Sequence, residues 1–244
     1  MAAERLDKIL ASQGIGSRKE VGQMIRRGIV SVDGILQKRP EFRVDPQQSE
    51  ICVDGRLLRV QKYLYLMMNK PAGVLSAARD KHTPTVIDLL PENFRRKDLF
   101  PAGRLDKDTT GLLIITNDGD MAHRMLAPKS HVFKLYEAEL DHPADETDVQ
   151  AFAQGIPLKD FTCLPARLEL QPGTSLVRVE VREGKFHQVK RMFAARGKNV
   201  VALRRLRMGG LFLDPNLKPG EVRELTNKEL TLIFSEKDVI NCAD

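Results

Sequence analysis

Residues 103–112 read GRLDKDTTGL and gather two aspartates, two threonines and a lysine between two glycines, directly before the apolar run LLIIT. A carboxylate on such a loop could serve as a nucleophile. Asp106 is flanked by Arg104 and Lys107, and these cations favour the ionised form that a nucleophile needs near neutral pH. A plain polar turn remains possible, because Asp, Thr and Gly are common turn residues.

Two other kinds of carboxylate site fit this loop less well. A calcium loop would need an oxygen ligand of another type where Thr110 stands and a bidentate glutamate where Asn117 stands. A phosphoaspartate enzyme needs Mg²⁺, further carboxylates and an apolar strand leading into the nucleophile. The approach to Asp106 is DLFPAGRL, which is a poor strand. The pattern excludes the calcium loop and makes the phosphoaspartate site the less favoured alternative.

Positive charge is concentrated in residues 178–207. This segment holds ten lysines and arginines against two glutamates, an excess of eight that is larger than the net +6 of the 244-residue chain. Such a segment attracts a polyanion. Its aromatic residues are few, Phe186 and Phe193, so contacts with phosphates of structured RNA are expected rather than stacking along a single strand. The alternative is an incidental basic face.

The composition predicts a folded, soluble protein of the cytoplasm. A hydrophobic share of 42% supports a core. Cys52, Cys163 and Cys242 are far apart and odd in number, which excludes a fully paired disulfide framework and offers no metal spacing. There is no apolar run of membrane or signal length. We therefore expect no metal, no cofactor and no membrane partner.

The first sixty residues have a pattern of their own. Residues 6–13 show helical spacing and end at Gly14, while Ser17 and Glu20 form a capping box for a second helix that ends at Gly28. The Asp-Gly pair in IVSVDGILQ predicts a hairpin. Four cations lie off the apolar stripe of the second helix and could contact phosphates or form an ordinary solvated face: Arg18, Lys19, Arg26 and Arg27.

The chain changes character near residues 60–63, which predicts a small domain at 1–60 and a larger one at 61–244. In the larger domain strands are expected in YLYLMMNK, LLIIT, FKLYEAEL, ARLELQ and LVRVEVRE. Helices are expected in DMAHRMLAP, in DETDVQAFAQG and in FHQVKRMFAARG. Their irregular order favours an α+β sheet domain over a βαβ repeat. The charged tail after Ile233 is expected to fray.

Four motifs together resemble those of the RNA pseudouridine synthases of the RsuA family. They are AGRLDKDTTGLLIITNDG, LMMNKPAGVLSA, KLYEAEL and EGKFHQVKRMFAARG. The N-terminal helices and hairpin resemble an S4 RNA-binding domain, so the likeness covers nearly the whole chain. It implies a small S4-type α/β domain followed by a synthase domain whose sheet is mixed and mostly antiparallel, flanked by helices and loops.

The resemblance also implies roles for single residues. Asp106 matches the catalytic aspartate, Tyr136 the tyrosine that packs against the target base and could accept a proton, and Lys190 the basic residue that pairs with the aspartate. Arg104 matches the residue that helps to fill the gap left by the extruded base. Further RNA contacts are expected from the basic motif: Lys185, His187, Gln188 and Arg191.

The implied reaction converts a specific uridine of ribosomal RNA to pseudouridine after the base has left its stack. The sequence does not choose whether Asp106 attacks C1′ of the ribose or C6 of the base. The likeness is closest to enzymes that act on 16S RNA of the small subunit, with 23S RNA as an alternative. A non-catalytic S4-type assembly factor is the alternative from another class. The expected partner is ribosomal RNA or a subunit precursor, bound by a monomer.

Overall fold

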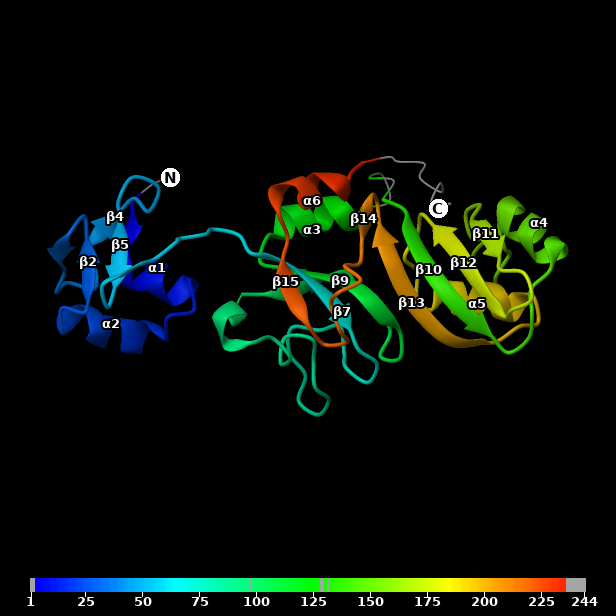
Figure 1. Cartoon of the computed structure of the whole chain (residues 1–244), viewed down its shortest axis with the longest axis horizontal. Helices are drawn as coiled ribbons and strands as arrows, with labels where there is room; N and C mark the ends of the chain where they lie inside the picture. Colours follow the sequence, from blue (N-terminus) through cyan, green and yellow to red (C-terminus); the bar gives the residue numbers. More distant parts are fainter. Residues whose placement is uncertain (1–2, 97, 128–129, 131, 236–244) are drawn as a thin grey trace. The chain divides into compact units, whose positions relative to one another are not determined.

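The computed structural model describes residues 3–96, 98–127, 130 and 132–235 (Figure 1). The chain divides into two compact units, Met1–Tyr63 with Pro91–Leu99 and Leu64–Leu90 with Phe100–Asp244. The tail that was expected to fray lies, beyond residue 235, outside the described residues. Within the described part of the chain, no helix combines the length and the apolar character needed to cross a membrane.

The first unit packs two short helices against small sheets, as the sequence predicts. The capping box forms, because the Ser17 backbone N–H donates to Glu20 Oε2 at 2.6 Å and the Glu20 N–H donates to Ser17 Oγ at 3.3 Å. Both Asp-Gly pairs turn hairpins, with Asp33 and Asp54 at a φ of 51°. The elements are β1 Glu4–Arg5, α1 Leu6–Ser12, α2 Arg18–Arg26, β2 Val30–Val32, β3 Ile35–Leu36, β4 Arg43–Val44, β5 Ile51–Val53, β6 Arg56–Leu57 and the 3₁₀ turn η1 Glu92–Phe94.

The second unit is built on a nine-stranded sheet in the order β11-β12-β10-β13-β9-β7-β15, with β14 beside β13 and β8 beside β9. Every pair is antiparallel except β13 with β9, so the expected mixed, mostly antiparallel sheet is confirmed. Its elements are β7 Tyr65–Lys70, β8 Phe100–Ala102, β9 Thr110–Thr116, α3 Gly119–Leu126, β10 Lys134–Leu140, α4 Glu146–Gln154, β11 Arg167–Leu170, β12 Leu176–Val181, α5 Gln188–Ala195, β13 Val200–Met208, β14 Leu211–Phe212, β15 Val222–Glu224 and α6 Asn227–Leu232.

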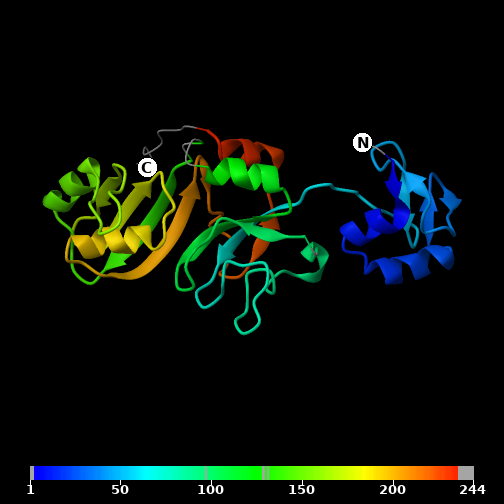
Figure 2. The ribbon, with the colours of Figure 1, turned by 180° about the vertical axis from the view of Figure 1, so that it is seen from behind.

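Helices cover both faces of this sheet. Leu112 and Ile114 of β9 share a core with Met208 of β13, with α3 and with the end of α6, and α3 and α6 lie together over this part of the sheet (Figure 1). Alternate strand residues point to opposite faces. Helix α5 lies behind β12 in Figure 1 and in front of it in the reverse view of Figure 2. It contacts α4 through the tilted rings of Phe193 and Phe152, whose centroids are 4.8 Å apart.

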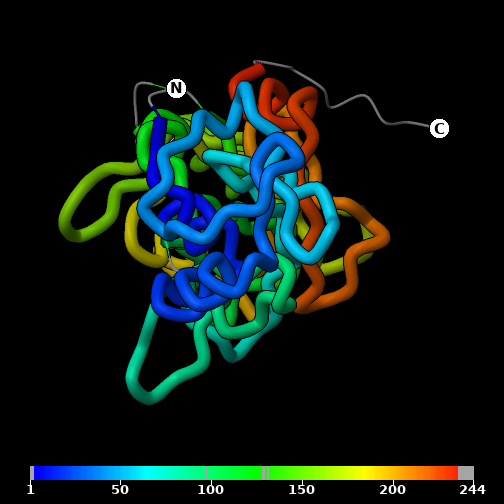
Figure 3. Tube along the Cα trace, turned by 90° about the vertical axis from the view of Figure 1, so that its left-hand side faces the viewer, coloured from blue at the N-terminus to red at the C-terminus, as the bar shows by residue number. Residues whose placement is uncertain are grey.

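A long connection follows β7 and leads to β8. Within it Leu75 and Thr85 form an isolated bridge, and the segment between them extends outward as a loop (Figure 3, teal). The beginning of this connection, residues 70–76, passes next to the loop that contains GRLD. That contact positions the candidate site.

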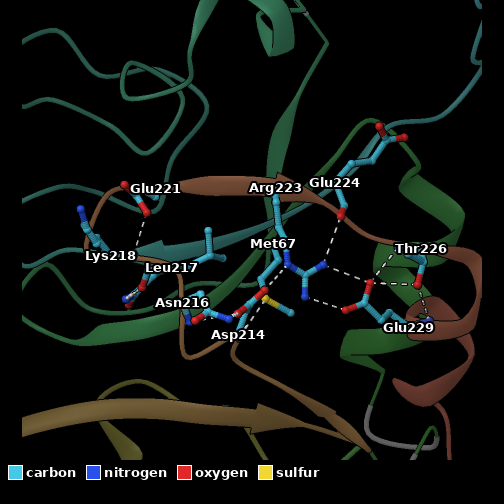
Figure 4. A network of polar contacts seen from close by, with 11 residues as sticks. Met67, Asp214, Asn216, Leu217, Lys218, Glu221, Arg223, Glu224, Thr226 and Glu229 are labelled. Carbon is cyan, nitrogen blue, oxygen red and sulfur yellow. Dashed lines mark hydrogen bonds and ion pairs between the residues drawn. The ribbon is translucent and has the colours of Figure 1, made fainter.

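The last strand and helix are fixed by one arginine. Arg223 of β15 donates from Nε to Asp214 at 2.6 Å and from Nη2 to Glu229 at 2.6 Å (Figure 4). Glu229 in turn accepts from the backbone N–H of Thr226, the N-cap of α6. The guanidinium therefore joins β15, the loop after β14 and the first turn of α6.

Candidate active site

The loop that carries Asp106 connects β8 to β9 and is held by the segment after β7. The Ser76 hydroxyl donates to Leu105 O at 2.8 Å and accepts from Leu105 N at 3.0 Å. The Gly73 N–H donates to Lys107 O at 2.8 Å. Leu105 is itself buried. The residue before Asp106 and the residue after it are thus both fixed by hydrogen bonds, which restricts where the carboxylate can point.

Lys70 is the central support of this loop. Its side chain is fully buried, although it is the last residue of an apolar strand. The three N–H groups of the ammonium are shared among four carbonyl oxygens, those of Pro71 at 3.0 Å, Asp106 at 3.1 Å, Lys107 at 3.2 Å and Thr109 at 2.9 Å. Burial lowers the pKa of Lys70 from 10.5 to about 8, so the side chain is mainly protonated at pH 7.

Asp106 points toward α5. Its Oδ1 lies 3.5 Å from Nε2 of His187, and its Oδ2 lies 3.9 Å from Nζ of Lys190. The Asp106 side chain is 28% exposed, so the carboxylate is accessible. The structure therefore brings Asp106 close to Lys190, the partner that the resemblance implies. His187 lies nearer to the carboxylate than Lys190 does.

The main partner of Lys190 differs from the expectation. Lys190 Nζ lies 2.7 Å from both carboxylate oxygens of Asp108, closer than it lies to Asp106. The hydrogen bond from Lys190 lowers the pKa of Asp108 below its ordinary value. Asp108 is at the exposed tip of the same loop, where both of its carboxylate oxygens face Lys190 on the first turn of α5. The lysine thus joins the loop to α5 as well as facing Asp106.

A pocket opens beside Asp106 and contains about 430 Å³ of space, including its open mouth. Tyr136 of β10 and Leu203 of β13 form part of its wall, and Tyr136 is only 9% exposed. Arg104 lies exposed at the mouth. The buried hydroxyl of Thr109, which also lines the pocket, has no hydrogen-bond partner among the described residues. A flat ring, a carboxylate and a cation therefore converge on one cavity.

The sequence did not single out Lys70, Ser76 or Thr109 as functional residues. The only signal for Lys70 was a lysine at the end of an otherwise apolar strand in the motif LMMNKP. Ser76 and Thr109 belong to quoted motifs, but nothing in their spacing indicates which backbone groups or cavities they meet. Their roles follow from contacts that the fold creates.

The basic segment is not one open surface, which corrects the expectation drawn from its charge. Three of its ten cations are buried, and a fourth, Arg196, is 34% exposed and binds a buried carboxylate. Arg205 and Arg207 are each 3% exposed; Arg205 donates to Leu112 O at 2.8 Å, and Arg207 pairs with Glu180. The other two, Arg196 and Lys198, both bind the buried carboxylate of Asp148, at 2.8 and 2.7 Å.

The other expected RNA-contacting residues of this motif are also tied to neighbours. Gln188 is buried and its amide nitrogen donates to Glu183 at 3.1 Å. Lys185 lies 3.0 Å from Glu183 and covers the ring of Phe161. Arg191 pairs with Asp160. Lys185 and Gln188 nevertheless line the pocket, so the segment shapes the site as well as carrying charge.

The four cations expected on the second helix are all exposed in the first unit. Arg18 forms an ion pair with Asp7 at 3.3 Å, yet 60% of its side chain remains exposed. Lys19, Arg26 and Arg27 present their charges to solvent from the same helix. This arrangement fits contacts with phosphates. Among the described residues, no group of three or more His, Cys, Asp and Glu side chains could hold a metal ion.

Comparisons with known families agree with both units. Residues 64–195 match the RNA pseudouridylate synthase family. Residues 4–49 match the S4 domain. The synthase match includes Asp106, Tyr136 and Lys190.

Individual relatives cover almost the entire chain. The uncharacterized RNA pseudouridine synthase YtzG of Bacillus subtilis is 46% identical, over 94% of this chain and 98% of its own length. Ribosomal small subunit pseudouridine synthase A of Escherichia coli K12 is 42% identical, over 94% and 99%. A crystal structure of a pseudouridylate synthase matches with a TM-score of 0.66 and 36% identity, over 94% and 99%. The chain therefore belongs to the RsuA family and is an RNA pseudouridine synthase with an S4 domain.

Proposed function

We propose that this enzyme converts one specific uridine of 16S ribosomal RNA to pseudouridine, with Asp106 as the nucleophile. The observation that carries the proposal is the accessible Asp106 carboxylate at a pocket walled by Tyr136. The choice of 16S RNA rests on the E. coli relative, whose name states a small-subunit activity. The S4 domain supports binding of a structured RNA.

The reaction is an isomerisation in which no atom is gained or lost. The glycosidic bond between C1′ and N1 breaks, the uracil rotates in the pocket, and a bond between C1′ and C5 forms. Asp106 forms a transient covalent bond, either to C1′ of the ribose or to C6 of the base. The proton that leaves C5 passes to water, either directly or through the Tyr136 hydroxyl, which releases its own proton as it accepts the new one, and N1 gains a proton. No oxidant, reductant or co-substrate is required.

The target base must leave its stack before it can reach Asp106, which costs a few kcal/mol. The Tyr136 ring recovers part of this cost by stacking on the uracil. Arg104, at the mouth of the pocket, helps to fill the space that the base leaves. Lys190 and His187 keep the Asp106 side chain directed into the site. The exposed cations of α2 bind the flanking RNA through its phosphates.

The test is tritium release from transcripts of 16S and 23S RNA made with 5-tritiated uridine. We expect release from 16S RNA alone. Asp106→Asn should abolish it while RNA affinity stays within about tenfold, a difference of ~1.4 kcal/mol. Asp120→Asn, a change at an exposed carboxylate on α3, is the matched control and should release tritium normally.

Two results would contradict the proposal. Turnover by the Asp106→Asn variant would remove the nucleophile assignment. Release from 23S RNA, or from neither RNA, would remove the substrate assignment. Carbodiimide mapping by primer extension in a strain lacking the gene then identifies the uridine that is no longer modified.

A further inference from the structure

Phe186 is the most exposed phenylalanine among the large apolar residues of the described chain, with 72% of its surface accessible. It lies between Lys185 and His187, which both line the pocket beside Asp106. A single exposed apolar side chain needs no explanation by itself. Its surroundings, however, are specific in three ways.

First, the ring of Phe186 is stacked. It lies parallel to the imidazole of His187, with centroids 3.8 Å apart and an interplanar angle of 17°. The same imidazole reaches Asp106 with Nε2 at 3.5 Å. One ring of the pair therefore faces the catalytic carboxylate, and the other carries the stack outward into solvent.

Second, the turn that presents the pair is fixed on both sides. The Lys185 N–H donates to Gln188 Oε1 at 3.1 Å, and the Gln188 N–H donates to Lys185 O at 3.1 Å. Glu183 binds Gln188 Nε2 at 3.1 Å and the Leu164 N–H at 2.9 Å. The exposed ring thus stands on a turn that does not need to reorganise, and a rigid aromatic surface binds with a small entropy cost.

Third, His187 adopts a left-handed backbone conformation, with a φ of 49°. A residue other than glycine rarely occupies this region, and such strain is concentrated at functional sites. Here the unusual conformation begins α5 and allows neighbouring side chains 186 and 187 to stack.

We propose that Phe186, backed by His187, is a stacking platform for an unpaired base of the RNA next to the target uridine. The inference rests on the proposed function and names the part of the substrate that this surface binds. Extrusion of the target uridine uncovers a face of the adjacent base. An exposed aromatic side chain between two residues that line the pocket can cover that face, whatever the base, because every base has a π-face. Lys185, which lines the same pocket and is 41% exposed, provides a charge for the adjoining phosphate.

The platform also changes the expectation from the sequence, where few aromatic residues argued against stacking. A stack at one position needs only one well-placed ring. The contact with RNA therefore combines phosphate binding with a single aromatic contact at the active site.

The test uses a short oligouridylate that carries the fluorescent base 2-aminopurine beside one uridine. Stacking quenches this fluorophore, so the wild-type protein should quench it on binding. Phe186→Ala should lose the quenching and bind about 5- to 150-fold more weakly, the usual range for one base–aromatic stack. Because Phe186 is exposed, the substitution should leave the fold intact.

Three further variants decide whether the ring itself is needed. Phe186→Tyr and Phe186→Trp keep a ring and should quench and bind like the wild type, whereas Phe186→Leu keeps an apolar side chain without a ring and should behave like Phe186→Ala. Phe212→Ala is the matched control, because that phenylalanine is 48% exposed on β14 and, unlike Phe186, has no chain neighbour that lines the pocket. It should bind normally.

The inference is overturned if Phe186→Ala keeps both affinity and quenching, or if Phe186→Leu matches the wild type. Both readouts measure binding, so they do not depend on turnover. In the Asp106→Asn background the quenching should persist. Activity of the Asp106→Asn variant would contradict the nucleophile assignment and leave the stacking platform unaffected. If the Phe186 variants showed no difference in quenching or affinity, the platform would be contradicted and the nucleophile assignment would be unaffected.

Discussion

Replacing Lys70 by methionine should separate catalysis from stability, because this buried side chain holds the loop of Asp106, the proposed nucleophile. Its ammonium group donates to the carbonyl oxygens of Pro71, Asp106, Lys107 and Thr109. Methionine has a similar length and is apolar, so it fills the space without donating a hydrogen bond. The question is whether the loss of these bonds or the removal of a buried charge has the larger effect.

The two effects on stability nearly cancel. The carbonyls of Asp106 and Lys107 keep other donors, Thr109 N and Gly73 N. The carbonyls of Pro71 and Thr109 lose the Lys70 donor, at about 1–3 kcal/mol each if they remain buried. In return the substitution removes the cost of burying an ammonium group. Burial lowers the pKa of Lys70 from 10.5 to about 8, a shift that corresponds to about 3 kcal/mol. We expect the free energy of unfolding to fall by no more than about 3 kcal/mol.

The effect on catalysis should be much larger. Without Lys70 the loop relaxes, and a displacement of the nucleophile by about 1 Å can cost about 100-fold in rate. We therefore expect kcat for tritium release from 16S RNA to fall about 100-fold, with RNA affinity retained. Urea unfolding gives the stability of the same preparation, and Lys81→Met, at an exposed lysine, is the control. A variant that keeps kcat within about threefold of wild type, or that loses activity only in proportion to its unfolded fraction, would refute the reasoning.

Three further predictions concern single contacts. Ser76→Ala removes both hydrogen bonds to the Leu105 backbone; we expect about 1–2 kcal/mol less stability in urea and a lower kcat, and an unchanged kcat would show that this support is dispensable. Asp148→Asn leaves two cations without a charged partner; urea unfolding should show a loss of about 3–5 kcal/mol, and a negligible loss would mean that the buried ion pairs contribute nothing net. The hydrogen bond from Arg223 lowers the pKa of Glu229 from 4.5 to about 2. Because this pKa is lower in the folded than in the unfolded state, the stabilisation is present above the unfolded value and is lost as the pH falls toward the folded one. Thermal unfolding of Glu229→Gln should therefore depend less steeply on pH in that acid range, and an equal dependence would contradict the assignment.

Local signals in the sequence were sufficient for many elements of the fold. The helix around residues 18–26 has its capping box, and the helix before Gly155 ends where that glycine takes a φ of 92°. Strand β13 was missed, although it is central to the sheet. Its run VVALRRLRM contains three arginines, which obscure the apolar alternation. Arg205 and Arg207 are nevertheless buried, because a backbone carbonyl and Glu180 satisfy part of their hydrogen-bonding capacity. Such compensation depends on strands that are distant in the sequence.

The site shows the same limit. Resemblance to a family pointed to Asp106, Tyr136 and Lys190, and the structure places all three around one loop and pocket. The resemblance could not show that Lys190 binds Asp108 more closely than Asp106, since the two carboxylates lie two residues apart on the same loop. The buried role of Lys70 was also hidden, because a strand pattern does not reveal which carbonyl groups lie at the end of the strand.

The position of the site follows from the one parallel pair in the sheet. Strands β9 and β13 pair at only two positions, Thr110 with Arg204 and Gly111 with Arg205. A Cβ at Gly111 would lie 2.3 Å from the Arg205 carbonyl oxygen, and Gly111 has a φ of 98°, so only glycine permits this close approach. Beyond this short contact the antiparallel halves of the sheet continue separately. One half supplies Asp106, the proposed nucleophile, on the loop before β9. The other half supplies Tyr136 from β10, together with His187, the N-cap of α5, and Lys190 of its first turn, which face Asp106. The candidate active site is assembled where the halves meet, which explains why its residues come from motifs so far apart in the sequence.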